Sequence, residues 1–232
     1  MSTRVAFDRR FRGPLTSTNG GYAAGMLAAY LDDNNAIEGG RDAVEVTLRL
    51  PPPLDTPLEI TAVSDHAALV NDGQVLAVAA RGHLDTEPTT VSPDQAAEAT
   101  KRNVRWGDPV FAECFSCGIR PEHDNLAIHP GPVAGMPDVV AAPWIAREAS
   151  VPVVWSAIDC SGAYAVSPRG RGEALLGRMT ARIIRLPDEG EPCVVVGWRL
   201  AEDGRKLHAG TALHTADGTV LAASRQVWIA PH

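Results

Sequence analysis

The sequence predicts an α+β protein made of two similar units, each an apolar helix wrapped by an antiparallel sheet. Apolar or very small residues fill positions 20–31 and 151–166, and a helix that is apolar on every face is buried all round. Strand-like segments separated by short turns follow each of these stretches. One sheet around one helix leaves a sheet edge exposed, so we expect the two units to pair as a pseudo-dimer with a site between them.

Three matches in the same order indicate that the two units are copies of one another. The apolar helix is the first match, and the others are Arg-Leu-Pro at 49–51 and 185–187, and Asp-Gly-x-Val-Leu-Ala at 72–77 and 217–222. The stretch between the units is richer in Pro, Thr and charge, which is typical of a linker. The expected division is an N-terminal unit, a linker and a C-terminal unit, at residues 1–85, 86–108 and 109–232.

The first helix is expected over Gly20 to Leu31, after a chain break at Gly13-Pro14. Its N-cap is one of three consecutive polar residues, namely Ser17, Thr18 and Asn19. Three glycines, Gly20, Gly21 and Gly25, would weaken this helix in isolation. Their presence indicates that a backbone or a ligand approaches closely at that point.

The first sheet is expected as an antiparallel meander after this helix. Its strands are predicted from alternation at 44–50, 57–65, 66–70 and 74–84, with one further short strand at 4–8. The turn Asn71-Asp72-Gly73 supplies the positive φ angles that a tight hairpin requires.

The second unit repeats this plan with an insertion at its start. Residues 92–102 are expected as a short surface helix within the linker, and 125–133 and 139–146 as two extra strands. The long apolar helix then occupies 151–166, and a final hairpin strand ends the chain.

Composition limits the kind of partner. The chain has 232 residues, a net charge of -7 and no basic block, which argues against nucleic acid because phosphate binding needs clustered Lys and Arg. No apolar run is long enough to span a bilayer, and the N-terminus lacks the apolar core of a signal peptide. We therefore expect a cytoplasmic protein with reduced cysteines that acts on a small molecule.

One carboxylate, Asp159, lies in the middle of the second apolar helix. An ionised carboxylate buried among apolar neighbours is strongly unfavourable unless it is paired or hydrogen-bonded. We interpret Asp159 as catalytic. The alternative is a carboxylate at the interface between the units that is satisfied by hydrogen bonds.

A family resemblance rests on residues of both units. Asn19-Gly20-Gly21-Tyr22 is similar to the polar- or aromatic-Gly-Gly helix start of the type II acyl-CoA thioesterases. Asp159 in the second helix and the terminal DGTVLAASRQ, which ends in Gln226, match the second unit of that family. Together with two helix-wrapped sheets in one chain, these residues resemble the double hotdog fold of the thioesterase-like superfamily.

The resemblance implies an acyl-CoA thioesterase in which an Asp, a hydroxyl residue and a Gln hold the attacking water. Asp159 and Gln226 fall at the first and last of these positions. The middle position falls near Leu176-Gly177, which has no hydroxyl group, so Thr180 is the nearest candidate.

The same resemblance places Asn19, Gly20, Gly21 and Tyr22 in the substrate-binding site. Free N–H groups at the helix start would face the thioester carbonyl, where the helix dipole also favours negative charge. Asn19 either caps this helix or assists that anion site. The implied partner is acyl-CoA or a related thioester, and proteins of this fold commonly associate further, so a homo-oligomer is expected.

Other function classes stay open or are disfavoured. Because the middle hydroxyl group is missing, a binding protein that keeps the acyl groove without chemistry is the alternative. A dehydratase on the same fold would need a His in the helix region, and neither predicted helix has one. The sequence has no G-x-S-x-G elbow and no dinucleotide or P-loop glycine pattern, which disfavours Ser hydrolases and nucleotide-fold enzymes.

No cofactor or metal is expected, because thioester hydrolysis needs only a base and oxyanion donors. One pattern resembles a zinc site: Cys114, Cys117, His123 and His129 have the spacing C-x2-C-x5-H-x5-H. No second Cys pair follows, so two reduced thiols in a packed turn are the simpler interpretation.

Overall fold

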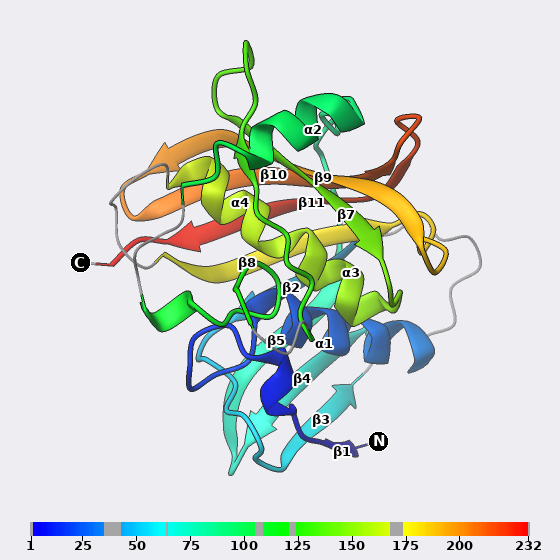
Figure 1. Cartoon of the computed structure of the whole chain (residues 1–232). Coiled ribbons are helices and arrows are strands. Elements are labelled where there is room, and N and C mark those ends of the chain that lie inside the picture. Colours follow the sequence, from blue (N-terminus) through cyan, green and yellow to red (C-terminus); the bar gives the residue numbers. More distant parts are fainter. Residues whose placement is uncertain are drawn as a thin grey trace.

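One continuous antiparallel sheet of 11 strands runs through the computed structural model of the chain (Figure 1). The strand order is β1-β3-β4-β5-β2-β8-β11-β10-β9-β7-β6. The structure describes residues 2–34, 43–63, 65–104, 109–120, 124–167 and 174–231.

The N-terminal half follows the predicted plan of one helix and a meander. Its elements are β1 (Ser2–Val5), η1 (Arg9–Phe11), α1 (Gly20–Asn34), β2 (Ala43–Leu48), β3 (Leu58–Val63), β4 (His66–Asn71) and β5 (Gln74–Gly82). Asp72 and Gly73 have φ angles of 45° and 81°, as the hairpin turn requires. The first strand is shifted towards the N-terminus relative to the prediction, because its pairing with β3 covers Ser2 to Val5, and Asp8 instead caps η1.

The C-terminal half adds the insertion and the second wrapped helix. Its elements are α2 (Pro93–Thr100), η2 (Pro109–Phe111), β6 (Gly131–Pro132), β7 (Val139–Ala146), α3 (Val151–Ala157), α4 (Asp159–Val166), β8 (Leu175–Ile183), β9 (Glu191–Asp203), β10 (Lys206–Thr215) and β11 (Val220–Ile229). Helix α2 starts with a Ser92 capping box and buries Ala96 and Ala99 against a cluster that includes Val194 of β9, so this part of the predicted linker packs on the second sheet.

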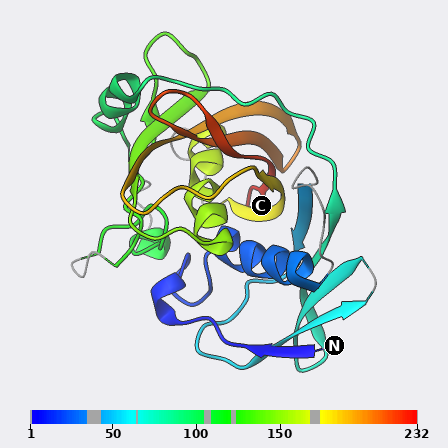
Figure 2. The same cartoon turned by 90° about the vertical axis from the view of Figure 1, so that its right-hand side faces the viewer.

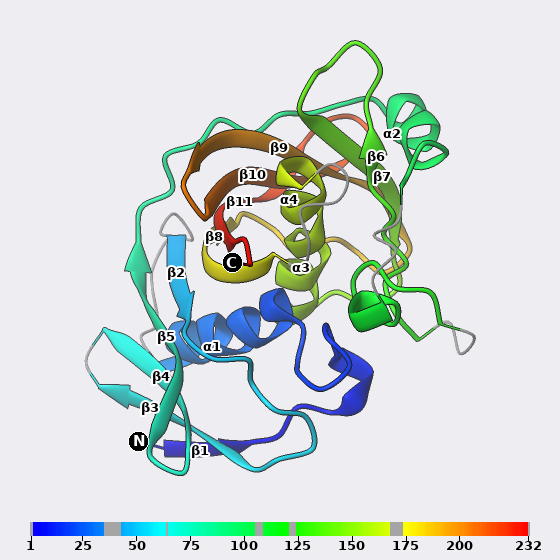
Figure 3. The same ribbon diagram turned by 90° about the vertical axis from the view of Figure 1, so that its left-hand side faces the viewer.

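The two halves join along β2 and β8, where Val44 pairs with Ala181 and Thr47 with Arg178. Strands β1–β5 surround α1, and β7–β11 surround α3 and α4 (Figures 2 and 3). This arrangement is the double hotdog, so the predicted fold class of two helix-wrapped antiparallel sheets is confirmed. None of the helices in the described part of the chain combines the length and apolar character that a membrane span needs.

Helix α1 packs directly against the second helix, and its glycines make this possible. A Cβ atom on Gly21 would lie 2.6 Å from Cβ of Asp159, and one on Gly25 would lie 2.6 Å from Cα of Pro152. Both distances are shorter than real Cβ contacts, so only glycine fits. The close approach that the sequence indicated is therefore between the two helices.

The second helix differs from the prediction, because it is broken. Ile158 has φ -88° and ψ 0°, outside the helical region, and separates α3 from α4. Asp159 consequently begins a new helix instead of lying in the middle of one.

Candidate active site

Asp159 is buried where the two helices meet, with 2% of its surface exposed. Its Oδ2 accepts hydrogen bonds from Nδ2 of Asn19 at 2.9 Å and from the backbone N–H of Gly21 at 3.0 Å. Its Oδ1 is also buried and has no hydrogen-bond partner among the described residues. One oxygen of the carboxylate is therefore fixed and the other is available.

Burial raises the pKa of Asp159 to about 7. The hydrogen bond from Gly21 opposes this shift, and the charge of the Cys114 thiolate adds to it. Removal from water disfavours the ionised form more than two hydrogen bonds favour it.

Asn19 joins the two helices through both ends of its amide. Its Oδ1 accepts from the N–H of Tyr22 at 2.8 Å, which is an N-cap, and from the hydroxyl group of Ser156 at 2.9 Å. Its Nδ2 reaches Asp159. Asn19 is therefore the N-cap of α1, and its amide also donates to the carboxylate of Asp159.

A cavity of about 260 Å³ opens beside Asp159. Its wall is mostly apolar and includes Leu48, Leu50, Phe111, Leu176, Trp228 and Ile229. Gly20 also lines it, and the Gly20 N–H has no acceptor among the residues that the structure describes. The helix start therefore presents one free donor to the cavity.

Thr18 is a site residue that the sequence offered only as a possible N-cap. It lines the cavity, it is 3% exposed, and its Oγ1 has no hydrogen-bond partner among the described residues. Two buried polar atoms without partners, Thr18 Oγ1 and Asp159 Oδ1, thus belong to the wall of one cavity. The polar run 17–19 before the glycines was the available signal.

Gln226 lies close to Asp159 in the fold but its amide is bonded elsewhere. Its Nε2 donates to the carbonyl oxygen of Ile158 at 2.8 Å, and its Oε1 accepts from Nε1 of Trp228 at 2.7 Å. A Cβ on Gly162 would lie 1.8 Å from this Oε1, so the amide packs directly on α4. Gln226 therefore holds the helix break that precedes Asp159, and no hydrogen bond joins the two side chains.

Thr180 is not brought to this site. Its neighbour Met179 faces Gln226, with the Met179 sulfur 4.0 Å from Nε2, and successive strand residues point to opposite faces of a sheet. Thr180 accordingly lies on the other face, where its hydroxyl group donates to Oε2 of Glu45 at 3.1 Å. Leu176 and Gly177, where the resemblance places the hydroxyl group, do line the cavity.

Tyr22, the last of the predicted substrate-binding residues, packs in an aromatic cluster. Its ring stacks on Phe11 with centroids 3.8 Å apart and meets Phe7 and Phe115 edge-on. Burial raises its pKa to about 12. It supports the start of α1 and is not among the residues that line the cavity.

Three buried cysteines adjoin Asp159: Cys114, Cys117 and Cys160. Nδ2 of Asn19 lies 3.7 Å from the Cys114 sulfur and so contacts both Cys114 and Asp159. Hydrogen bonds from the Cys117 and Cys160 thiols hold the pKa of Cys114 well below its usual range, and the same contacts raise the pKa of its two partners.

Of the two predicted histidines, His129 is the one that the structure describes, and it is not part of this cluster. His129 Nε2 lies 3.4 Å from the carbonyl oxygen of Gly118, and His123 lies outside the described residues. The third sulfur comes instead from Cys160, which the spacing pattern did not include.

Solved structures similar to this chain share its architecture over the full length. A protein assigned as a thioesterase from Novosphingobium aromaticivorans has a TM-score of 0.71 at 10% identity, with 100% of this chain and 96% of that chain covered. An acyl-CoA thioesterase II from Mycobacterium marinum has a TM-score of 0.64 at 11% identity, with 100% and 93% covered.

A dehydratase domain from Pseudomonas fluorescens is similar as well, with a TM-score of 0.63 at 14% identity and coverage of 99% and 94%. No protein-family model matches the chain, and no curated protein matches it. At these identities the likeness concerns the fold alone: the chain has the double hotdog fold.

Proposed function

We propose that the protein hydrolyses an acyl-CoA-type thioester, with Asp159 as the general base. The observation that carries this proposal is a buried carboxylate with one oxygen fixed by Asn19 and Gly21 and the other free, at the wall of a mostly apolar cavity. A general base has to be held in place and must keep one oxygen for the proton that it removes. Asp159 meets both conditions.

The cavity suits an acyl thioester in shape and polarity. Its apolar wall takes the acyl chain, since binding pockets are mainly apolar with a few placed polar groups. Arg49 is exposed and also lines the cavity, which supports a role for its guanidinium group in binding the phosphates of the CoA part.

In the proposed reaction a water molecule is held between Asp159 Oδ1 and Thr18 Oγ1, two buried polar atoms of the cavity wall that have no partner among the described residues. Asp159 removes a proton from this water, and the water oxygen attacks the thioester carbonyl carbon. The Gly20 N–H stabilises the oxyanion that forms. The C–S bond then breaks, and the proton on Asp159 passes to the departing thiolate, which regenerates the carboxylate.

Gln226 acts in this proposal through the helix break and not on the water. By donating to the Ile158 carbonyl oxygen it fixes the residue that precedes Asp159. We therefore assign Gln226 as a positioning residue, and Thr18 takes the role for which Thr180 was the sequence candidate.

Thiol release from acyl-CoAs of graded chain length tests the proposal. Asp159→Asn should lower kcat/KM on the order of 10²- to 10⁴-fold, the usual contribution of a general base. Its thermal midpoint should be unchanged or higher, because a buried carboxylate is replaced by a neutral amide of similar shape. Asp203→Asn, the same change at an exposed position of β9, is the matched control and should leave turnover unchanged. Full activity of Asp159→Asn would exclude the role of this carboxylate.

A binding protein without chemistry is the second candidate, and it is favoured by Leu176 and Gly177, which occupy the cavity wall without a hydroxyl group. Calorimetry distinguishes the two. Acyl-CoA binding by the wild-type protein without any thiol release would favour the binding protein, whereas turnover that requires Asp159 favours the hydrolase.

A further inference from the structure

Three cysteines from two distant segments come together beside the cavity. Cys114 and Cys117 lie in the irregular segment after η2, and Cys160 lies in the first turn of α4. Their sulfur atoms all lie within 4.8 Å of one another, and all three side chains are buried. This cluster takes no part in the proposed hydrolysis.

The sulfur positions fit a metal better than a disulfide. The sulfur atoms of Cys114 and Cys160 are 3.7 Å apart, whereas a disulfide needs about 2.05 Å. Tetrahedral zinc with Zn–S bonds of about 2.3 Å places its sulfur ligands about 3.75 Å apart. We propose that Cys114, Cys117 and Cys160 bind one zinc ion.

The turn that carries two of the ligands is built for close sulfur positions. The sequence Cys114-Phe-Ser-Cys117-Gly118 closes on itself with a hydrogen bond from the Gly118 N–H to the Cys114 carbonyl oxygen at 2.8 Å. A Cβ atom on Gly118 would lie 2.3 Å from the Cys114 nitrogen, so only glycine permits this turn. Cys117 is thereby returned to the side of Cys114.

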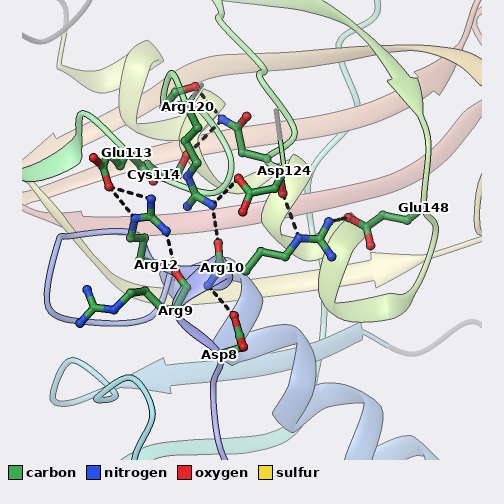
Figure 4. Close-up of polar contacts among 11 residues, drawn as sticks. Asp8, Arg9, Arg10, Arg12, Glu113, Cys114, Arg120, Asp124 and Glu148 are labelled. Atoms are coloured by element: carbon green, nitrogen blue, oxygen red, sulfur yellow. Dashed lines mark hydrogen bonds and ion pairs between the residues drawn. The ribbon is translucent and has the colours of Figure 1, made fainter. Parts of the chain in front are cut away.

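Contacts that do not involve the cysteines also fix this segment. The buried Arg120 donates from Nε to the Glu113 carbonyl oxygen and from Nη1 to the Arg10 carbonyl oxygen, both at 2.7 Å (Figure 4). Nη1 also reaches Asp124 Oδ1 at 3.0 Å, and Nε of Arg10 donates to the Asp124 carbonyl oxygen at 2.9 Å (Figure 4). The segment that carries the two sulfurs is therefore fixed on both sides of the turn, and such preorganisation favours metal binding.

The fourth coordination position lies on the cavity side. Cys114 and Cys160 line the cavity together with Asp159, so a water molecule from the cavity can complete the tetrahedron. Sites with three protein ligands and one water are the open type of zinc site, and thiolate ligands select zinc over Mg²⁺ or Ca²⁺. Three thiolates and Zn²⁺ carry one net negative charge, which the Asn19 amide near the Cys114 sulfur partly offsets.

The proposal does not depend on hydrolysis, because it is tested by metal content. The full-length protein is purified without chelator, with any affinity tag removed, and zinc is measured by elemental analysis. About one zinc per chain is expected, as for other sites with thiolate ligands. Cys117→Ser should lose at least tenfold in bound zinc. Cys193→Ser is the matched control, because Cys193 is the fourth buried cysteine and lies apart from the cluster in β9.

Cobalt substitution provides a second measurement on the wild-type chain, which avoids any variant that does not fold. The wild-type and Cys193→Ser proteins should show thiolate-to-cobalt charge-transfer absorption with tetrahedral d–d bands, and Cys117→Ser should lack it. A reduced wild-type protein that takes up neither zinc nor cobalt would overturn the proposal. So would Cys117→Ser that binds as much metal as the wild type. Neither result bears on whether Asp159 hydrolyses a thioester.

Discussion

The two buried helices of this protein occupy equivalent places in the two halves, but one is continuous and the other is broken. Helix α1 is unbroken from Gly20 to Asn34 and is capped by Asn19, so its first turn presents N–H groups. The second helix breaks at Ile158 and restarts at Asp159. One half thus supplies hydrogen-bond donors and the other supplies the carboxylate that they hold.

The difference shows how two units of the same plan can form an asymmetric site. The start of α1 meets the start of α4 where the Gly21 N–H donates to Asp159. The amide oxygen of Asn19 accepts a hydrogen bond from the Tyr22 N–H at the start of α1. The side chain of Gln226 donates to the Ile158 carbonyl oxygen at the break in the second helix. Changing each of these groups in turn shows what each helix contributes to stability and to turnover.

The largest loss of stability is expected from Gln226→Leu. This change leaves the Ile158 carbonyl oxygen and the Trp228 indole N–H without their partner, and each unsatisfied buried group costs about 1–3 kcal/mol. Denaturant unfolding should therefore show a decrease of about 2–6 kcal/mol in the free energy of unfolding.

The role of Gln226 in positioning has its own measurement. If Gln226 fixes the break before Asp159, kcat should fall while KM is nearly unchanged, because the cavity wall is retained. A variant that unfolds more easily but turns over at the wild-type rate below its unfolding transition would leave Gln226 with a structural role alone.

Gly21→Ala should separate the two helices. The new Cβ would lie 2.6 Å from Cβ of Asp159 and 2.7 Å from the Trp155 carbonyl oxygen, and overpacking of this kind costs about 1–3 kcal/mol. Gly20→Ala is the control for stability, since the nearest atoms to its Cβ would be side-chain atoms of Leu176 and Leu48, at 3.2 Å or more. Thermal unfolding should place Gly21→Ala clearly below Gly20→Ala, and equal midpoints would show that the helix contact is not tight.

Asn19→Ser tests separately the two roles of Asn19, as the N-cap of α1 and as a hydrogen-bond donor to Asp159. Serine is as good an N-cap as asparagine, but its shorter side chain leaves the buried Ser156 hydroxyl group without its acceptor, so the free energy of unfolding should fall by about 1–3 kcal/mol. The shorter side chain cannot reach Asp159 Oδ2, so kcat should fall on the order of tenfold, because one of the two groups that fix the base is lost. Thiol-release kinetics and thermal unfolding of the same preparation check both parts. An unchanged kcat would mean that Gly21 alone holds the carboxylate.

The smallest effect is expected from His214, which connects the second sheet to the segment before α2. Its Nδ1 lies 2.7 Å from the Thr215 carbonyl oxygen, and its Nε2 accepts from the Val91 N–H at 3.4 Å, so it is neutral in the fold. Burial lowers its pKa below the usual 6.5, and the neighbouring Asp217 only partly opposes this shift.

The sign of the pH dependence follows from this shift. Below pH 6.5 the unfolded chain takes up a proton at His214 that the folded protein does not, so stability falls as the pH is lowered through that range. Unfolding measured between pH 7.5 and about pH 5.5 should show a steeper decrease for the wild type than for His214→Gln. Parallel curves would show that another group is responsible.

Much of the fold could be predicted because its signals are local. The apolar stretches, the Asp72-Gly73 hairpin and the glycine positions of α1 depend on propensity and periodicity, which neighbouring residues determine. The carboxylate at Asp159 also stood out, because a single charge in an apolar segment is unusual wherever the segment lies. The roles of the other site residues were harder to predict.

The sequence by itself determined which helices are buried, which turns are tight and which acid is enclosed. Only the tertiary structure decided that Thr180 faces away from the helices, that Gln226 is bonded to the break at Ile158, and that Cys160 joins Cys114. A strand residue changes faces with a shift of one position, and contacts between segments far apart depend on how whole elements pack. The sequence shows which residue types are available for chemistry, but the packing of whole elements decides which of these residues contact one another.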